Sequence, residues 1–214
     1  MVHQAPMQNP LTCLKNLELR IMEHFLSLNP VEIEHNCGRF RWLPPPPNVI
    51  KLNVDATFSG SVAKIAVVAR DHNGSVLQAW LKQIASFDAS CAEAVAIVWA
   101  LEIASSLNFS CIYVESDAKL CVDAVLGKSV DCFWSFQTLC TNAQFLTLNF
   151  SFCKFMWVRR EANSVAHKLA GFCPPHGLTF SCKMGTLPPF VKEAWLSDAP
   201  PPLVFLFFNK IGRI

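Results

Sequence analysis

Apolar residues alternate with polar or small residues along three consecutive segments: residues 49–58, 62–70 and 75–83. This alternation predicts half-buried β-strands, and in the first segment it places Leu52, Val54 and Ala56 on one face. The second link between the segments, residues 71–74 (DHNG), is typical of a turn whose glycine adopts a positive φ. The pattern therefore predicts a three-stranded antiparallel meander.

Helical and extended patterns then alternate up to residue 173. Helices are predicted over residues 90–107, 117–126, 133–146 and 163–172, and further strands over residues 111–115 and 149–158. A strand that follows a helix is connected by a crossover, which favours parallel neighbours. The predicted fold class is therefore α/β, with a five-stranded mixed sheet (three antiparallel and then two parallel strands) flanked by helices.

Proline-rich segments divide the chain into three parts. Residues 44–47 are all proline and predict a stiff extended linker, and further prolines follow residue 173. We expect an N-terminal extension, one domain and a Pro- and Phe-rich C-terminal tail, over residues 1–48, 49–173 and 174–214 respectively. Helical spacing of apolar residues also predicts a helix over residues 11–28 of the extension.

Composition narrows the function classes. The 214 residues are 52% hydrophobic and carry a net charge of only +2, which excludes a disordered chain and a strongly basic nucleic-acid arm but permits a local basic patch. No segment approaches the roughly 18 uninterrupted apolar residues of a membrane span, so we expect no membrane partner. The ten cysteines form no C-x-x-C pair. We expect a monomer in a reducing, intracellular compartment, either nucleus or cytoplasm.

Three acidic residues occupy positions that need an explanation. Asp55 lies in a strand, where Asp is disfavoured, Glu93 begins an apolar helix stripe, and Asp117 directly follows a buried strand. The structural alternatives are a turn residue for Asp55, a Ser90–Glu93 capping box, and a helix N-cap for Asp117. The three side chains converge if the strand of Asp55 is the sheet neighbour of the strand before Asp117.

Converging carboxylates raise one another's pKa unless a cation neutralises them. Their hard oxygen ligands suit Mg²⁺ or Mn²⁺. Clusters of this kind support phosphodiester cleavage with two metal ions, one activating water and the other stabilising the leaving oxygen. We therefore expect two Mg²⁺ (or Mn²⁺) ions as cofactors.

Five segments occur in a characteristic order: residues 51–55 (KLNVD), 67–74 (VVARDHNG), 92–96 (AEAVA), 114–117 (VESD) and 160–170 (REANSVAHKLA). Together with the lead-in at residues 42–46 (WLPPP), they resemble the type 1 ribonuclease H domain, and in particular its plant and retroelement-derived members. The resemblance covers about residues 40–173. It implies a ribonuclease H-like fold and metal-dependent cleavage of the RNA strand in an RNA–DNA hybrid.

The resemblance also assigns roles to particular residues. Asp55, Glu93 and Asp117 match the metal-binding carboxylates of the family, and His167 falls at the fourth acidic position, where many active members have Asp and plant relatives often have His. As a catalytic residue, His167 binds a metal or relays a proton. The structural alternative is a solvent-facing helix histidine.

Two further departures from the family concern activity. Ala56 replaces the usual glycine after the first aspartate, and residues 158–162 are too short to carry the histidine loop of some members. An alternative is therefore a weakly active or inactive nucleic-acid-binding or interaction module derived from a retroelement. A third is the remnant of a retroelement polyprotein that has lost its polymerase.

The resemblance implies recognition of hybrid through 2′-hydroxyls and phosphates. Candidate nucleic-acid contacts are the polar residues near the acids and an arginine pair that precedes the last helix: Asn53, Ser116, Asn163, Arg159 and Arg160. A solvated strand end is the structural alternative for the two arginines. Binding through so few cations is expected to be weak and sensitive to salt.

Overall fold

The computed structural model describes residues 41–86, 88–128, 134–174 and 179–198. The helix predicted over residues 11–28 lies outside the described residues. The predicted division at residues 48 and 173 separates parts of the chain that contact one another in the structure, because Trp42 is buried and the chain beyond residue 173 adds to the sheet.

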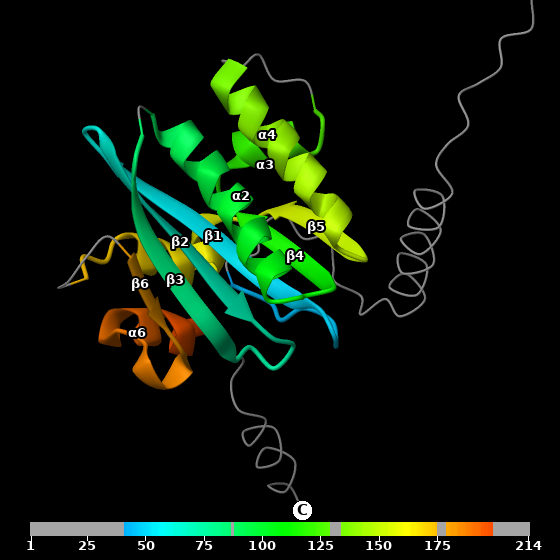
Figure 1. Ribbon diagram of the computed structural model, residues 1–214. Helices are drawn as coiled ribbons and strands as arrows, with labels where there is room; N and C mark the ends of the chain where they lie inside the picture. The colour runs from blue at the N-terminus through cyan, green and yellow to red at the C-terminus, as the bar shows by residue number, and fades with distance from the viewer. Residues whose placement is uncertain (1–40, 87, 129–133, 175–178, 199–214) are drawn as a thin grey trace, which may run out of the picture.

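The predicted sheet is present, with its expected arrangement of strands (Figure 1). Its six strands are β1 (Ile50–Ser59), β2 (Val62–Arg70), β3 (Val76–Ala85), β4 (Cys111–Ser116), β5 (Phe152–Trp157) and β6 (Thr179–Cys182). They are arranged in the order β5-β4-β1-β2-β3-β6. Strands β1, β2 and β3 form the antiparallel meander, β4 is parallel to β1, and β5 is parallel to β4.

The expectation of five strands is corrected by β6, which pairs antiparallel with β3 at the edge of the sheet. The segment predicted to be a tail also forms helix α6 (Pro189–Asp198). Cys182, Leu187 and Val191 are buried in a cluster with residues of β2, β3 and the last helix of the predicted domain. The fold extends past residue 173 because these apolar residues cover sheet surface that water would otherwise contact.

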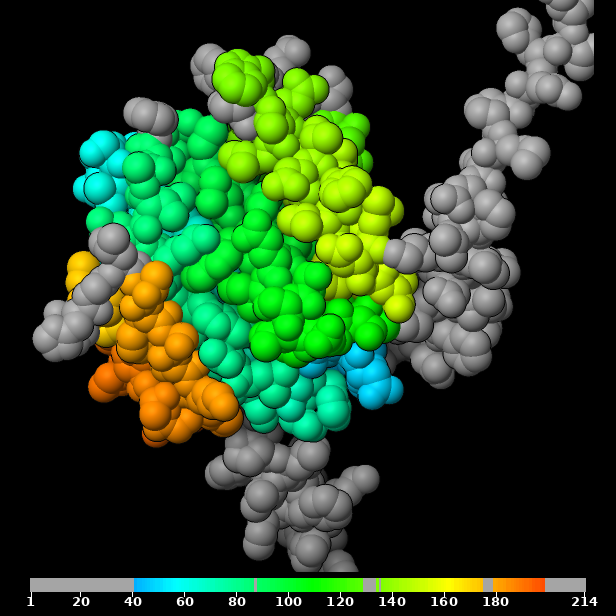
Figure 2. Space-filling view, in the orientation of Figure 1, coloured from blue at the N-terminus to red at the C-terminus, as the bar shows by residue number. Residues whose placement is uncertain are grey.

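Helices cover both faces of the sheet. Helices α2 (Ala89–Ser106), α3 (Lys119–Val125) and α4 (Trp134–Leu146) lie together on one face, where α2 and α4 form much of the surface seen in Figure 2. Helix α5 (Ser164–Ala170) packs on β1 and β2 from the opposite face, and α6 packs against α5. The sheet is thus a middle layer between two helical layers.

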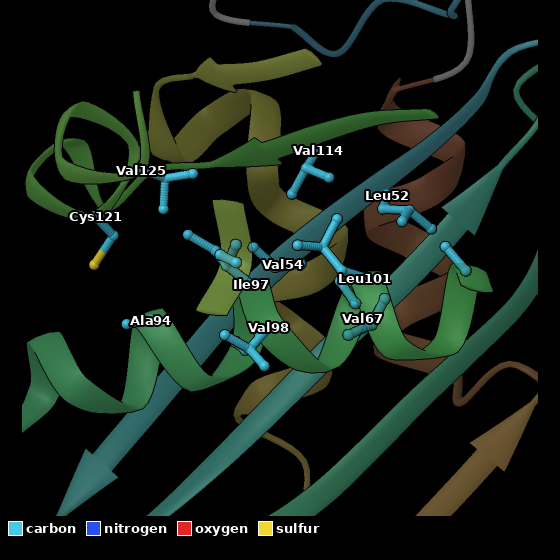
Figure 3. Packing of buried hydrophobic residues seen from close by; sticks show 14 of the residues in the cluster. Leu52, Val54, Val67, Ala94, Ile97, Val98, Leu101, Val114, Cys121 and Val125 are labelled. Atoms are coloured by element: carbon cyan, nitrogen blue, oxygen red, sulfur yellow. The ribbon is translucent and has the colours of Figure 1, made fainter. Parts of the chain in front are cut away.

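Alternation along β1 separates an apolar face from a polar face. Leu52 and Val54 are fully buried and lie toward α2, where Ile97 and Leu101 pack against them (Figure 3). Ala56 is packed against the same cluster, so the predicted apolar face of this strand is confirmed. The intervening positions of β1 carry polar side chains, which consequently lie toward α5.

Helix α2 is long and apolar enough to cross a membrane by length and composition, and it alone meets that test among the described residues. In the structure it is the central helix of the main core cluster. Half of its length is buried against the sheet and neighbouring helices, which accounts for its apolar composition.

Replacing Leu101 with alanine tests the contact of α2 with the sheet. Because Leu101 is fully buried, we expect Leu101→Ala to lower the free energy of unfolding by about 3 kcal/mol, measured by urea denaturation. The matched control is Leu196→Ala on α6, where the leucine is 54% exposed and the change is expected to be within about 0.5 kcal/mol. Equal effects for the two variants would contradict this assignment of the core.

Candidate active site

The structure brings Asp55, Glu93 and Asp117 together from three elements. Asp55 lies in β1, Glu93 lies in the N-terminal part of α2, and Asp117 follows β4 directly. Because β1 and β4 are parallel neighbours, with Val54 paired to Ser116, the residues that follow this pair are at the same end of the two strands. One carboxylate oxygen from each side chain lies within 4.8 Å of the other two.

Neither helix uses these carboxylates as a cap. Helix α2 is capped by Asp88, whose side chain accepts a hydrogen bond from the backbone N–H of Cys91, so the capping box considered for Glu93 is absent. Helix α3 begins at Lys119, two residues later than predicted, and Ala118 is its N-cap. Capping therefore does not explain why Glu93 and Asp117 are acidic.

Burial and mutual repulsion favour the protonated form of two of the acids. Burial raises the pKa of Asp55 to about 9, and the negative charges of Glu93 and Asp117 contribute further. Burial, followed by repulsion from Asp117, raises the pKa of Glu93 to about 8, although a hydrogen bond from the Ala56 backbone opposes that shift. Without a cation, the cluster therefore holds protons at neutral pH.

Two carboxylate oxygens of the cluster are buried without a hydrogen-bond partner among the described residues: Asp55 Oδ1 and Glu93 Oε2. A buried acceptor without a donor costs about 1–3 kcal/mol, and more when it is charged. A divalent cation between the carboxylates would satisfy both oxygens and remove the repulsion. The all-oxygen donor set fits Mg²⁺ or Mn²⁺.

His167 faces the cluster from α5. Its Nδ1 lies 3.2 Å from Asp55 Oδ2, while 39% of its side chain is exposed to solvent. Burial, and then the positive charge of Arg160, lower the pKa of His167, which favours the neutral imidazole at neutral pH. His167 therefore contacts the acidic cluster from its edge, which the alternative of a purely solvent-facing histidine does not account for.

Arg160 contacts the cluster, and Arg159 is exposed next to it. The Arg160 Nε donates to Asp117 Oδ2 at 2.9 Å, and 65% of its side chain is exposed. Arg159 is the N-cap residue of the short helix η2 (Arg160–Asn163). Arg160 therefore places a positive charge at the exposed edge of the acidic cluster.

Trp157 is an exposed residue next to the acidic cluster that the sequence pattern did not identify. Its indole Nε1 donates to the backbone carbonyl of Asp117 at 3.0 Å, and the residue is 45% exposed. The sequence pattern predicts a strand over residues 149–158 but gives no sign that Trp157 borders the acids. An exposed aromatic ring in this position is suited to stacking on another planar group that approaches the acids.

The structure corrects the direct nucleic-acid contacts expected for Asn53, Ser116 and Asn163, because all three are buried. The Ser116 hydroxyl accepts from the Ala118 backbone N–H at 3.1 Å. Asn163 donates to the Val54 carbonyl at 2.8 Å and to Asp117 Oδ1 at 3.4 Å. These residues support the site from inside the protein, and their side chains are too buried to contact a ligand.

Solved structures share this fold at low sequence identity. RNase H1 from the halophilic archaeon Halobacterium salinarum is 22% identical with a TM-score of 0.55, over 57% of this chain and 95% of that chain. The N-terminal RNase H domain of a Mycobacterium tuberculosis protein, solved as a fusion with maltose-binding protein, is 24% identical with a TM-score of 0.54, over 57% and 91%. LC11-RNase H1, isolated from compost and solved in complex with an RNA/DNA hybrid, is 21% identical with a TM-score of 0.51, over 57% and 93%.

The mixed sheet, its two helical layers and these neighbours define a protein with the ribonuclease H-like fold. The sequence model of the reverse transcriptase-like family matches residues 53–173, which is more than half of the chain. The chain therefore belongs to the reverse transcriptase-like family. Its comparison with curated proteins gave no match.

The raised pKa values predict how stability depends on pH. Between the ordinary pKa of an aspartate, 3.8, and the folded value of about 9, folded Asp55 binds a proton that the unfolded chain does not. The free energy of unfolding of the metal-free protein should therefore fall as pH rises through this window, and Mn²⁺ should reverse the fall. Thermal unfolding at pH 5, 7 and 8.5, with EDTA or with Mn²⁺, measures both effects.

Asp55→Asn is the control for this pH effect, because it removes the charge and keeps the shape of the side chain. At pH 8.5 without metal, we expect it to raise the free energy of unfolding by about 2 kcal/mol and to flatten the pH dependence. A metal-free wild-type protein whose stability does not fall over this window would contradict the assigned cluster.

Proposed function

We propose that this protein is a metal-dependent endoribonuclease that cleaves the RNA strand of RNA–DNA hybrids. The observation that carries the proposal is the set of three carboxylates whose oxygens lie within 4.8 Å of one another, two of them with a buried oxygen that lacks a partner among the described residues. The fold is that of RNase H1 structures, one of which was solved with an RNA/DNA hybrid.

Asp55, Glu93 and Asp117 would hold two Mg²⁺ or Mn²⁺ ions. When bound, such ions supply an activated water and stabilise the leaving oxygen of the phosphodiester. The Ala56 backbone N–H orients the Glu93 carboxylate, and Asn163 orients Asp117. Because these groups are set before substrate binds, the site would not need to reorganise during the reaction.

His167 gives the site a group that can hold a proton. Its imidazole is neutral at neutral pH and partly exposed, and it is oriented by the 3.2 Å contact with Asp55. A proton released at the site during cleavage, or one needed by the leaving oxygen, could reside on this ring. Its nitrogen is also a ligand that suits Mn²⁺ better than Mg²⁺.

Exposed side chains around the acids are suited to bind the substrate. Arg159, Arg160 and Lys168 would attract the phosphates, and Trp157 would stack on a base or sugar. RNA is distinguished from DNA by its 2′-hydroxyl groups and helix shape rather than by base sequence. We therefore propose recognition of the hybrid by shape, with little dependence on base sequence.

The Ala56 side chain lies on the opposite face of β1 from Asp55. The methyl group of Ala56 packs against the main core cluster, while its backbone N–H donates to Glu93. A side chain at this position therefore points into the protein, which supports an active enzyme over an inactive binding module. The inactive module remains the alternative outcome of the experiments below.

We also propose a retroelement-derived protein of plants that acts as a monomer inside the cell, in the nucleus or the cytoplasm. Membership of the reverse transcriptase-like family supports the retroelement origin.

Charge-removing substitutions test the carboxylates. We expect Asp55→Asn, Glu93→Gln and Asp117→Asn each to lower the rate of hybrid cleavage at least about 100-fold, because each removes a ligand charge from the metal site. The assay uses a labelled RNA–DNA hybrid with Mg²⁺ or Mn²⁺, and the same RNA as a single strand for comparison.

Asp123→Asn is the matched control for these three variants. Asp123 lies on α3 and forms ion pairs with Lys119 and Lys128, away from the cluster, so its loss should change the rate less than twofold. The inactive binding module is the better description if the wild-type protein cleaves no hybrid with either metal. The same holds if all three variants cleave as fast as the wild type.

His167 variants test the choice of metal. We expect His167→Asp to raise Mg²⁺-supported cleavage relative to Mn²⁺-supported cleavage by several-fold, since a carboxylate oxygen replaces a nitrogen ligand beside Asp55. His167→Ala should slow cleavage with both metals by about tenfold. Rates for His167→Ala that equal those of the wild type would show that this histidine has no part in the reaction.

A further inference from the structure

A continuous series of buried polar contacts joins α6 to the acidic cluster. Asp198 Oδ2 accepts from Arg70 Nη1 at 2.8 Å, and Arg70 Nη2 donates to Asn53 Oδ1 at 2.8 Å. Asn53 Nδ2 in turn donates to Asn163 Oδ1 at 3.3 Å, and Asn163 Nδ2 lies 3.4 Å from Asp117 Oδ1. We call these five residues the buried polar chain.

The guanidinium of Arg70 and the carboxylate of Glu115 together fix the orientation of the Asn53 amide in the buried polar chain. Because a guanidinium only donates, Asn53 must turn its oxygen toward Arg70 and its NH₂ group toward Glu115 and Asn163. Asn163 must then turn its own oxygen toward Asn53, which leaves its NH₂ group for Val54 and Asp117. Arg70 thus supplies the donor for the Asn53 oxygen, and both amides are held in a single orientation.

Arg70 is held in place from two sides. Its side chain is fully buried, Asp198 pairs with its charge, and its guanidinium carbon lies 3.7 Å from the centre of the Trp42 ring. Arg70 belongs to β2 and Asp198 is the last residue of α6. A buried arginine without its counter-ion would be strongly unfavourable, so the position of Arg70 depends on Asp198.

We propose that Asp198 is a positioning residue of the active site, acting through Arg70, Asn53 and Asn163 on Asp117 and on the strand that carries Asp55. This inference rests on the proposed function. It assigns a catalytic purpose to α6, which lies beyond residues 53–173, the part matched by the family. A protein cut after the family match would lack the acceptor that holds Arg70.

Helix α6 has other anchors besides Asp198. The Trp195 indole N–H donates to the Gly74 carbonyl at 2.8 Å, and Val191 is fully buried. Gly74 has a φ of +79°, and a Cβ at this position would lie 3.3 Å from the Trp42 ring, so the turn fits closely over that ring. Variants of Asp198 are therefore expected to fold with α6 in place.

The first test uses Asp198→Asn in the full chain, with Glu193→Gln as the control. Both substitutions replace a carboxylate with an amide on α6, but Glu193 is exposed. We expect Asp198→Asn to weaken Mn²⁺ binding, measured by calorimetry, and to lower kcat for hybrid cleavage, each about tenfold, with KM for the hybrid little changed. The control should match the wild type in both readouts.

The second test separates positioning from stability. In Arg70→Met/Asp198→Leu both charges are removed together, so no buried ion is left unpaired and the melting temperature should return close to that of the wild type. The donor to Asn53 is still missing, so Mn²⁺ affinity and kcat should remain about tenfold low. An ion pair with a purely structural role would restore all three quantities, which would overturn the proposal.

Failure of the inference can be distinguished from failure of the proposed function. If the wild-type protein binds Mn²⁺ but does not cleave hybrid, the proposed function fails while the Mn²⁺ affinities of the variants still test the inference. If the wild type cleaves and Asp198→Asn matches it in kcat and Mn²⁺ affinity, the inference fails and the proposed function stands.

Discussion

The mutual repulsion of three carboxylates in one partly buried site is the constraint on which the rest of the structure depends. Asp55 and Glu93 are buried enough for their pKa values to rise to about 9 and about 8. In the metal-free protein, the fold therefore keeps the carboxylates together although they repel one another. The opposing free energy comes from the apolar contacts of β1 and α2, which fix the backbone positions of both acids. A loose core would let the acids separate.

Strand β1 has two roles because its two faces differ. Leu52 and Val54 pack under α2, while the alternate positions Lys51, Asn53 and Asp55 point toward α5 and are all buried. Lys51 pairs with Glu115 of the neighbouring strand at 2.7 Å, whereas Asp55 keeps one buried oxygen without a partner among the described residues. Because both sets of side chains belong to one strand, a shift of the core-facing residues also shifts the polar residues of the site.

The sequence predicted the convergence of the acids on the condition that two strands are neighbours in the sheet. Period-two alternation located β1 and a short apolar strand located β4, and the structure shows that the two are parallel neighbours, which brings Asp55 and Asp117 to the same end of the sheet. The roles of Asn53 and Asn163 could not be found in this way. Their burial depends on partners such as Arg70 and Glu115, which are distant along the chain.

Strand β6 and helix α6 were missed for a different physical reason. Four residues of strand give too little alternation to identify, and the prolines around them are typical of loops and tails. Their order comes from contacts with β3 and α5, which a local pattern does not contain. The predicted tail is therefore an element stabilised by tertiary packing rather than by its own propensity.

The ion pair of Arg70 and Asp198 is best explained by orientation rather than by stability. A buried ion pair is often no more stabilising than apolar residues of the same volume, because desolvation of the two charges offsets their attraction. An apolar pair would fill the same space between β2 and α6, but it would leave the buried Asn53 oxygen without its donor. The guanidinium supplies that donor, and Asn53 and Asn163 connect it to the Asp117 carboxylate. The site therefore requires Arg70 for the hydrogen bond that it donates to Asn53, and not for the Coulomb energy of its ion pair.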